Sequence, residues 1–198
     1  MTTRRVAWRR SDEVETDEWC TLTVRPTGAT LMGTVIGAQD GLPLRIEYRV
    51  LTNPNGQTAA VHVRQWHGFE QRQLTLARNE KGAWTRDGAA LRQLKGCTDV
   101  DLECSPATNA LPIRRLRLAV GASDEIQAAW IRFPGLTVEK SRQRYTRVDA
   151  EGTYRYASGS FESELTVDDD GLVYGYAVWR RIGLAEGSDD SEPLDSVR

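Results

Sequence analysis

Few of the patterns that identify common functional classes are present in this chain of 198 residues. No apolar run approaches the ~20 residues that a membrane-spanning helix needs, and charges recur too often near the N-terminus for a secretory signal. The 26 basic and 28 acidic residues give a formal net charge of −2, without the basic excess that phosphate contacts require of a nucleic-acid binder. These absences predict a soluble, cytoplasmic protein with no membrane span and no nucleic-acid partner.

Cysteine and histidine are also scarce, which limits disulfide, metal and nucleophilic chemistry. Cys20, Cys97 and Cys104 are odd in number and widely spaced, so they give neither a disulfide framework nor a zinc pattern. His62 and His67 are separated by a turn and do not form a helical metal pair, and no serine lies in a nucleophile elbow. We therefore expect no metal, no cofactor and no catalytic residue of these types.

The dominant pattern is period-two alternation interrupted by Gly, Asn and Asp turns. Apolar residues at 44, 46, 48 and 50 alternate with charged residues at 45, 47 and 49, which is typical of a half-buried antiparallel strand. The turn at 53–56 and the return strand at 60–66 complete a hairpin. The pattern recurs along the chain, giving about a dozen strands of a sandwich or barrel. The sequence thus predicts an all-β, antiparallel, barrel-like domain with at most one or two short helices, at 89–94 and 110–116.

The alternation is continuous enough that residues 1–182 are predicted to form one domain. Residues 183–198 differ, because they hold five acidic residues and few apolar ones. Such a segment cannot bury enough surface to offset its chain entropy. We expect it to be an acidic, disordered tail.

The segment 96–116 is unlike its surroundings. Asp99, Asp101 and Glu103 alternate with apolar residues, which on a strand puts three carboxylates on one face, with neighbours ~7 Å apart. Turn and capping residues follow at 105–109, and then a cluster of arginines at 114, 115 and 117.

Two interpretations of this segment remain open. In one, the carboxylates and Asn109 hydrogen-bond sugar hydroxyls while arginines hold a phosphate or carboxylate. In the other, the carboxylates form a solvated strand face that pairs with the nearby arginines. The carboxylate spacing approaches the ~6.5–9.5 Å of inverting glycosidases, but neighbours on one face reach a glycosidic bond from the same side, which disfavours hydrolysis.

Tryptophan and tyrosine are well represented, with six residues of each. Most are expected in the core, because aromatic side chains dominate burial. Two or three are expected to line a ligand pocket, since such rings also stack on sugar faces.

Several motifs carry a resemblance to a known family. They are GC-x-DVDL at 96–102 and P-x-TN-x-LPIRRL at 106–116, then Q-x-YT at 143–146, YRY at 154–156, L-x-VD-x-DGLV at 165–173 and RR at 180–181. Weaker agreement occurs at 46–50 and 82–84, so the resemblance covers roughly residues 19–182. The sequence resembles the bacterial family described as putative glycolipid-binding. Cys104 and Ala110 depart from the small or hydroxyl residues that relatives often have there.

The resemblance implies a spiral β-roll, similar in outline to the periplasmic carriers that shuttle lipoproteins, and a glycolipid ligand. It brings no catalytic residues. The candidate ligand-binding residues are the polar members of these motifs: Asp99, Asp101, Thr108, Asn109, Arg114, Arg115, Gln143 and Tyr145.

The leading hypothesis is a non-enzymatic protein that binds a glycolipid or another acyl-bearing molecule inside the roll, with the polar cluster at its mouth. The first alternative is a carbohydrate- or lipid-modifying enzyme using Asp99 or Asp101, which predicts a carboxylate buried in a cleft with a raised pKa. The second is a structural or partner-binding module, which predicts a filled interior and an apolar patch on the outside.

Overall fold

The computed structural model describes residues 1–187, which form one sheet of 15 strands with one short α-helix. The first part of the chain supplies β1 (Thr2–Arg10), β2 (Thr16–Arg25), β3 (Gly28–Gln39), β4 (Leu42–Thr52), β5 (Thr58–His67), β6 (Glu70–Arg78), β7 (Trp84–Arg86), β8 (Ala89–Ala90) and the 3-10 turn η1 (Arg92–Leu94). The second part supplies β9 (Asp99–Leu102), η2 (Pro106–Asn109), α1 (Ala110–Leu116), β10 (Ser123–Arg132), β11 (Thr137–Arg147), β12 (Thr153–Ser158), β13 (Phe161–Val167), β14 (Val173–Tyr176) and β15 (Trp179–Gly187). The prediction of an all-β single domain is confirmed.

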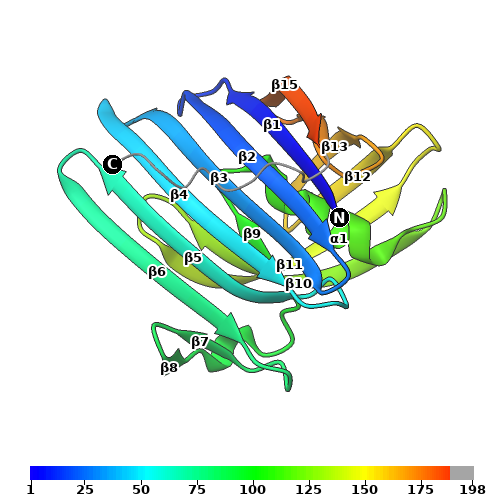
Figure 1. The fold of residues 1–198 in the computed structure, drawn as a ribbon, viewed down its shortest axis with the longest axis horizontal. Helices are drawn as coiled ribbons and strands as arrows, with labels where there is room; N and C mark the ends of the chain where they lie inside the picture. Colours follow the sequence, from blue (N-terminus) through cyan, green and yellow to red (C-terminus); the bar gives the residue numbers. More distant parts are fainter. Residues whose placement is uncertain (188–198) are drawn as a thin grey trace.

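The strand order is simple, although the first and last strands, β1 and β15, are neighbours in its middle. The order is β8-β7-β6-β5-β4-β3-β2-β1-β15-β14-β13-β12-β11-β10-β9. The two parts of the chain therefore form two half-sheets, which the antiparallel pair β1–β15 joins (Figure 1). Of the pairs that the structure describes, β9–β10 is parallel and the others are antiparallel.

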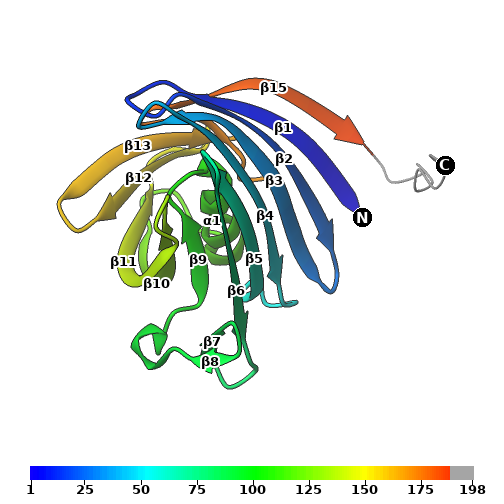
Figure 2. The same ribbon diagram turned by 90° about the vertical axis from the view of Figure 1, so that its left-hand side faces the viewer.

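The sheet is open but rolled. The last strand in the order, β9, lies against β5 of the opposite half: the Thr58 N–H donates to the Thr98 carbonyl at 2.9 Å, and the Val100 N–H donates to the Thr58 hydroxyl at 3.1 Å. As a result β9 and α1 lie within the curve of the sheet (Figure 2).

Hydrophobic side chains fill the space inside the roll. The inward positions of β4, from Leu44 to Val50, join a cluster that includes Trp8 and Leu102. Trp8 is fully buried, and its indole N–H donates to the Val173 carbonyl at 2.7 Å. This packing connects β1 of one half-sheet with β14 of the other.

The sequence analysis assigned no element to one end of the described chain, and the other end differs from the sequence-based expectation. The charge-rich N-terminal segment forms β1 because Val6 and Trp8 are buried at alternate positions. The expected tail begins at residue 183, whereas β15 continues to Gly187, with Leu184 opposite Val6 and Gly187 opposite Thr3. Backbone pairing with β1 stabilises these residues without apolar burial. The rest of the expected tail lies outside the described residues.

The helical expectation at 110–116 is met by α1, in which Pro112 occupies the first turn, where a proline is tolerated. The segment 89–94 forms the short strand β8 and then η1, a single turn of 3-10 helix, so the helical expectation there is met only in part. No helix within residues 1–187 has the length and apolar character needed to cross a membrane.

Candidate ligand-binding cleft

The three carboxylates of the β9 segment have different partners. Asp99 is fully buried and pairs with Arg115 at 2.6 Å. Glu103 pairs with Arg132 at 3.6 Å. Both carboxylates pair with an arginine, as one interpretation expected, but Asp99 is buried and not part of a solvated face, and Arg132 lies outside the arginine cluster at 114–117. Asp101 differs, because within residues 1–187 its recorded partners are neutral groups.

A network of neutral donors holds Asp101 and Asn109. The Gln143 side-chain amide on β11 donates to Asp101 at 2.6 Å, and the Thr108 hydroxyl on η2 donates to it at 3.4 Å. The Tyr145 hydroxyl donates to the Asn109 Oδ1 at 2.9 Å. Side chains of β11 and η2 thus fix the positions of Asp101 and Asn109.

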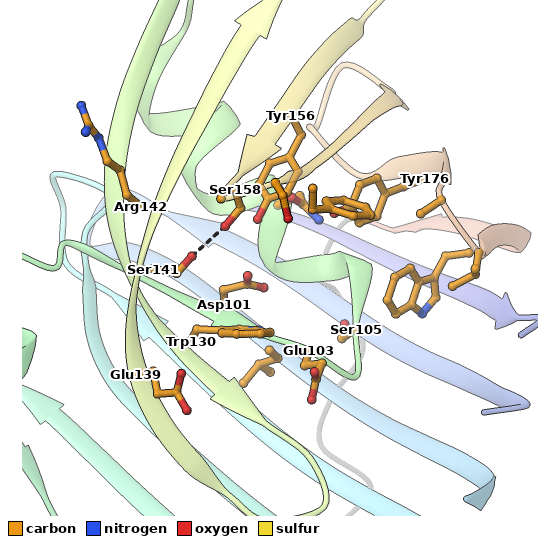
Figure 3. A pocket seen from close by; sticks show the side chains of 18 of the residues that line it. Asp101, Glu103, Ser105, Trp130, Glu139, Ser141, Arg142, Tyr156, Ser158 and Tyr176 are labelled. Atoms are coloured by element: carbon orange, nitrogen blue, oxygen red, sulfur yellow. Dashed lines mark hydrogen bonds between the residues drawn. The ribbon is translucent and has the colours of Figure 1, made fainter. Parts of the chain in front are cut away.

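Asp101 and Asn109 line a cleft of about 690 Å³, within the 300–1,000 Å³ typical of small-ligand sites. Aromatic side chains from five strands or their ends also line it: Trp130, Tyr156, Phe161, Tyr176 and Trp179. Figure 3 shows Asp101 between Trp130 on one side and Tyr156 and Tyr176 on the other.

The aromatic side chains support one another. The rings of Tyr176 and Trp179 stack with centroids 5.7 Å apart, and Tyr156 meets Tyr176 edge-on at 5.8 Å. The Arg10 guanidinium lies 5.0 Å from the Trp179 ring centroid. Such contacts hold aromatic rings in fixed orientations, so the cleft has a preformed wall.

Charged and hydroxyl side chains complete the lining. They are Arg10, Asp12, Glu103, Ser105, Glu139, Lys140, Ser141, Arg142, Ser158 and Ser160. Ser141 and Ser158 hydrogen-bond to each other at 3.0 Å (Figure 3). The cleft thus combines polar groups with flat apolar surfaces.

Burial determines the protonation behaviour of the cleft. It raises the pKa of Asp101 to about 6, although the hydrogen bonds from Gln143 and Thr108 act in the opposite direction. Burial also raises the pKa of the Tyr156 and Tyr176 hydroxyls. These hydroxyls therefore stay protonated at neutral pH, while Asp101 titrates close to it.

Another buried carboxylate, Glu18, lies beside the cleft. Glu18 on β2 accepts hydrogen bonds from the Tyr48 hydroxyl and from the Ser105 hydroxyl, the latter at 2.7 Å. Ser105 lines the cleft and also accepts from the Ala107 N–H at 3.1 Å, which caps η2. Burial raises the pKa of Glu18 to about 7.

The structure separates the residues predicted as one site into two groups. The cleft group comprises Asp101 and Asn109, with Gln143, Thr108 and Tyr145 behind them. The other group lies towards the C-terminal end of α1 and comprises Asp99, Arg114 and Arg115. Arg114 pairs there with Asp170 at 3.3 Å, so these arginines do not line the cleft.

Sequence reasoning did not assign the aromatic wall to the site, although it expected some aromatics in a pocket. One signal was available for Trp130. The run from Ala128 to Ile131 is apolar at successive positions, which indicates a strand covered on both faces. Glu18 alternates in step with Cys20 and Leu22, whose side chains point inward, so the same alternation also predicts that Glu18 is buried.

Side chains that commonly bind metal ions do not cluster in the part of the chain that the structure describes. Across residues 1–187, no group of three or more histidine, cysteine or acidic side chains is placed to bind a metal ion. The three cysteines are buried and unpaired. The lining of the cleft itself offers carboxylate, guanidinium, ammonium, amide, hydroxyl and aromatic groups.

A rolled antiparallel sheet with a preformed, aromatic-walled cleft defines an all-β protein of the ligand-binding class. The chain belongs to the family described as putative glycolipid-binding, whose model matches residues 5–181. It is also similar in structure to a DUF1089 family protein from Pseudomonas aeruginosa, with a TM-score of 0.75 and 33% sequence identity over 88% of this chain and 95% of that chain. A search of the curated proteins finds no match. The resemblance noted in the sequence is thus confirmed.

Proposed function

We propose that this protein binds the carbohydrate head group of a glycolipid in the cleft. The observation that carries the proposal is the position of Asp101 and Asn109 between aromatic rings. Sugars present hydroxyls at their edges and apolar C–H groups on their faces. A site that hydrogen-bonds the edges and stacks on the faces matches both, and the family description supports a glycolipid as the source of the sugar.

The proposal assigns the ligand to the cleft and not to the interior of the roll. The interior is occupied by hydrophobic side chains such as Trp8, Leu22 and Ile46, which are fully buried. An acyl chain there would have to displace them, at a cost comparable to that of disrupting a close-packed core. We therefore infer that the acyl chains stay in the membrane while the head group enters the cleft.

Vesicle binding tests this proposal. Phosphatidylcholine vesicles with and without a glucosyl diacylglycerol are titrated while tryptophan fluorescence is followed, since Trp130 and Trp179 line the cleft. We expect binding to the glycolipid vesicles, weakened about 10-fold or more by Trp130→Ala, because losing an aromatic anchor costs on the order of 1–2 kcal/mol. Trp19→Ala is the matched control, since Trp19 is 57% exposed on β2 and does not line the cleft.

The dependence of binding on pH gives a second readout. A carboxylate accepts stronger hydrogen bonds from sugar hydroxyls than a carboxylic acid does. Because the pKa of Asp101 is about 6, affinity should rise between pH 5 and pH 7, and Asp101→Asn should remove that rise. A panel of glycosyl lipids and free glycosides that all fail to bind the wild-type protein would contradict the proposal, as would equal binding by Trp130→Ala.

The raised pKa of Asp101 also favours a second candidate, an enzyme acting on the bound sugar. Asp101 would serve as general acid, and Glu139, which lines the same cleft from β11, would be the second carboxylate. Hydrolysis of nitrophenyl glycosides, lost in Asp101→Asn, would support this candidate. Binding without turnover would support the non-enzymatic function.

The partner-binding alternative also has an observation in its favour. On the outer face, Trp19 on β2 lies opposite Thr34 on β3, and Met32 and Ile36 flank that position. All three apolar side chains are at least half exposed. This patch and the filled interior agree with a partner-binding module, but neither accounts for an aromatic-walled cleft on another part of the molecule.

A further inference from the structure

A second hollow, of about 500 Å³, lies beside the C-terminal end of α1. The turn between β2 and β3 and the turn between β4 and β5 form its other sides. We call it the arginine hollow, because Arg25, Arg114, Arg115 and Arg117 line it. Of the described residues that line it, none is aspartate or glutamate. The chain as a whole carries a net charge of −2, so this concentration of positive charge is local.

Two of these arginines are held in place from behind. Arg115 uses Nε and Nη2 to bind Asp99, whose side chain is 1% exposed and does not line the hollow. The Arg115 side chain also packs close to Gly56, where an added Cβ would lie 3.2 Å from the Arg115 Cβ. Since a guanidinium has five N–H donors, the Nη1 group of Arg115 remains for another acceptor.

Arg114 is anchored in a similar way. Its Nη1 donates to the Asp170 carbonyl at 2.9 Å and to the Asp170 carboxylate at 3.3 Å. Asp170 in turn pairs with Arg4 on β1 at 2.7 Å. Within residues 1–187 these contacts use Nη1 of Arg114, so its Nε and Nη2 can donate to a further acceptor. The side chain is 28% exposed, so that acceptor can come from solvent.

The arginines outweigh the opposing charge of the helix end. The C-terminal end of an α-helix carries about half a negative charge, and the Arg117 N–H already satisfies the Ile113 carbonyl there. Four guanidinium groups line the hollow, and the contacts of Arg114 and Arg115 with Asp170 and Asp99 orient two of them. Guanidinium groups match the oxygens of phosphate and carboxylate in charge and geometry.

From this geometry we infer that the arginine hollow binds a phosphate group, at a site separate from the cleft. The source of the phosphate is either a small soluble molecule or a phospholipid head group, since both present the same oxygens. The hollow lies at the opposite end of α1 from Asn109, which lines the cleft. The inference therefore stands independently of the sugar-binding proposal.

Titration with inorganic phosphate tests the inference directly. Binding is followed by calorimetry on the wild-type chain, on the double variant Arg25→Gln/Arg117→Gln and on Arg64→Gln. Arg64 is an exposed arginine on β5 that does not line the hollow, so it is the matched control. We expect the wild type and the control to bind equally and the double variant to bind at least about 10-fold more weakly, because it removes two of the four positive charges that line the hollow.

The inference is overturned if the wild type shows no heat of binding, or if the double variant binds as tightly as the wild type. Asp101→Asn should retain phosphate binding, so a failure here is distinguishable from a failure of the cleft proposal. Sedimentation with phosphatidylcholine vesicles, with and without phosphatidic acid, then identifies the source. Sedimentation that depends on both phosphatidic acid and the arginines indicates a lipid, whereas binding of inorganic phosphate alone indicates a soluble ligand.

Discussion

Glu18 lies in the hydrophobic interior, 4% exposed, and its recorded partners are the hydroxyls of Tyr48 and Ser105. Its Oε2 atom has no hydrogen-bond partner within the described part of the chain. Burial therefore favours the neutral acid and raises its pKa from 4.5 to about 7. The folded state keeps this proton up to pH 7, while the unfolded chain releases it near pH 4.5. The contribution of Glu18 to stability is thus fully present at low pH and is lost between these two values.

Replacing Glu18 with glutamine should remove this dependence on pH. Glutamine keeps an oxygen acceptor for both hydroxyls and cannot ionise. Between pH 4.5 and pH 8 the free energy of unfolding of the wild type should fall by about 3 kcal/mol more than that of Glu18→Gln, since each pKa unit corresponds to about 1.4 kcal/mol. Urea unfolding of both proteins at the two pH values measures the difference. Parallel pH profiles would show that Glu18 is not the titrating group.

At the level of single residues, sequence analysis located part of the cleft. The alternation at 99–103 predicted a carboxylate face, and Asp101 and Asn109 do lie in a cleft. It could not separate Asp101 from Asp99, because the difference depends on where Arg115 lies after α1 packs. Asp99 and Asp101 are the same residue type on the same face of a predicted strand. Their roles differ because different residues, distant in sequence, contact them.

Among the elements, the pair β3–β4 shows how closely the strands are fitted. Gly33 lies opposite Tyr48, and a Cβ built on Gly33 would lie 2.3 Å from the tyrosine ring. The glycine therefore leaves space for the Tyr48 ring. In that position the Tyr48 hydroxyl donates a hydrogen bond to Glu18. A small residue on β3 thus supports a hydrogen bond to β2.

Gly33→Ala should destabilise the protein by about 1–3 kcal/mol, because an added methyl group overpacks this site and displaces the Tyr48 ring. Gly175→Ala is a suitable control, since a Cβ at Gly175 on β14 would have no atom within 4 Å. Thermal unfolding of the two variants measures the contrast. If both variants melt with the wild type, the contact between Gly33 and Tyr48 does not constrain the fold.

Sequence patterns predicted strands with one exposed face better than strands that are covered on both faces. The hairpin of β4 and β5 follows from simple alternation. β10 does not, because it is covered on both sides: Ala128 belongs to one hydrophobic cluster and Ala129 to the other. A strand that is buried on both faces has apolar residues at successive positions, so it lacks the alternation of apolar and polar residues on which the prediction depends.

For the whole molecule, the fold class was predictable and the strand order was not. Alternation of apolar and polar residues indicates which face of a strand is apolar, but it does not indicate which strand pairs with it in the sheet. The pairing of β1 with β15 and the contact of β9 with β5 join segments far apart in sequence. These long-range pairings create the roll, and with it both the cleft and the arginine hollow.

Because β1 and β15 are paired, the two half-sheets could follow one another along the chain in either order. Thr3 lies directly opposite Gly187, so a short glycine-rich linker can join them, and new ends can be opened at the exposed turn between Gly68 and Phe69. Such a circular permutant should fold with native circular dichroism and keep the ligand affinities of the linear chain. A permutant that stays unfolded would mean that the ends of the chain, and not only its strand pairing, direct assembly.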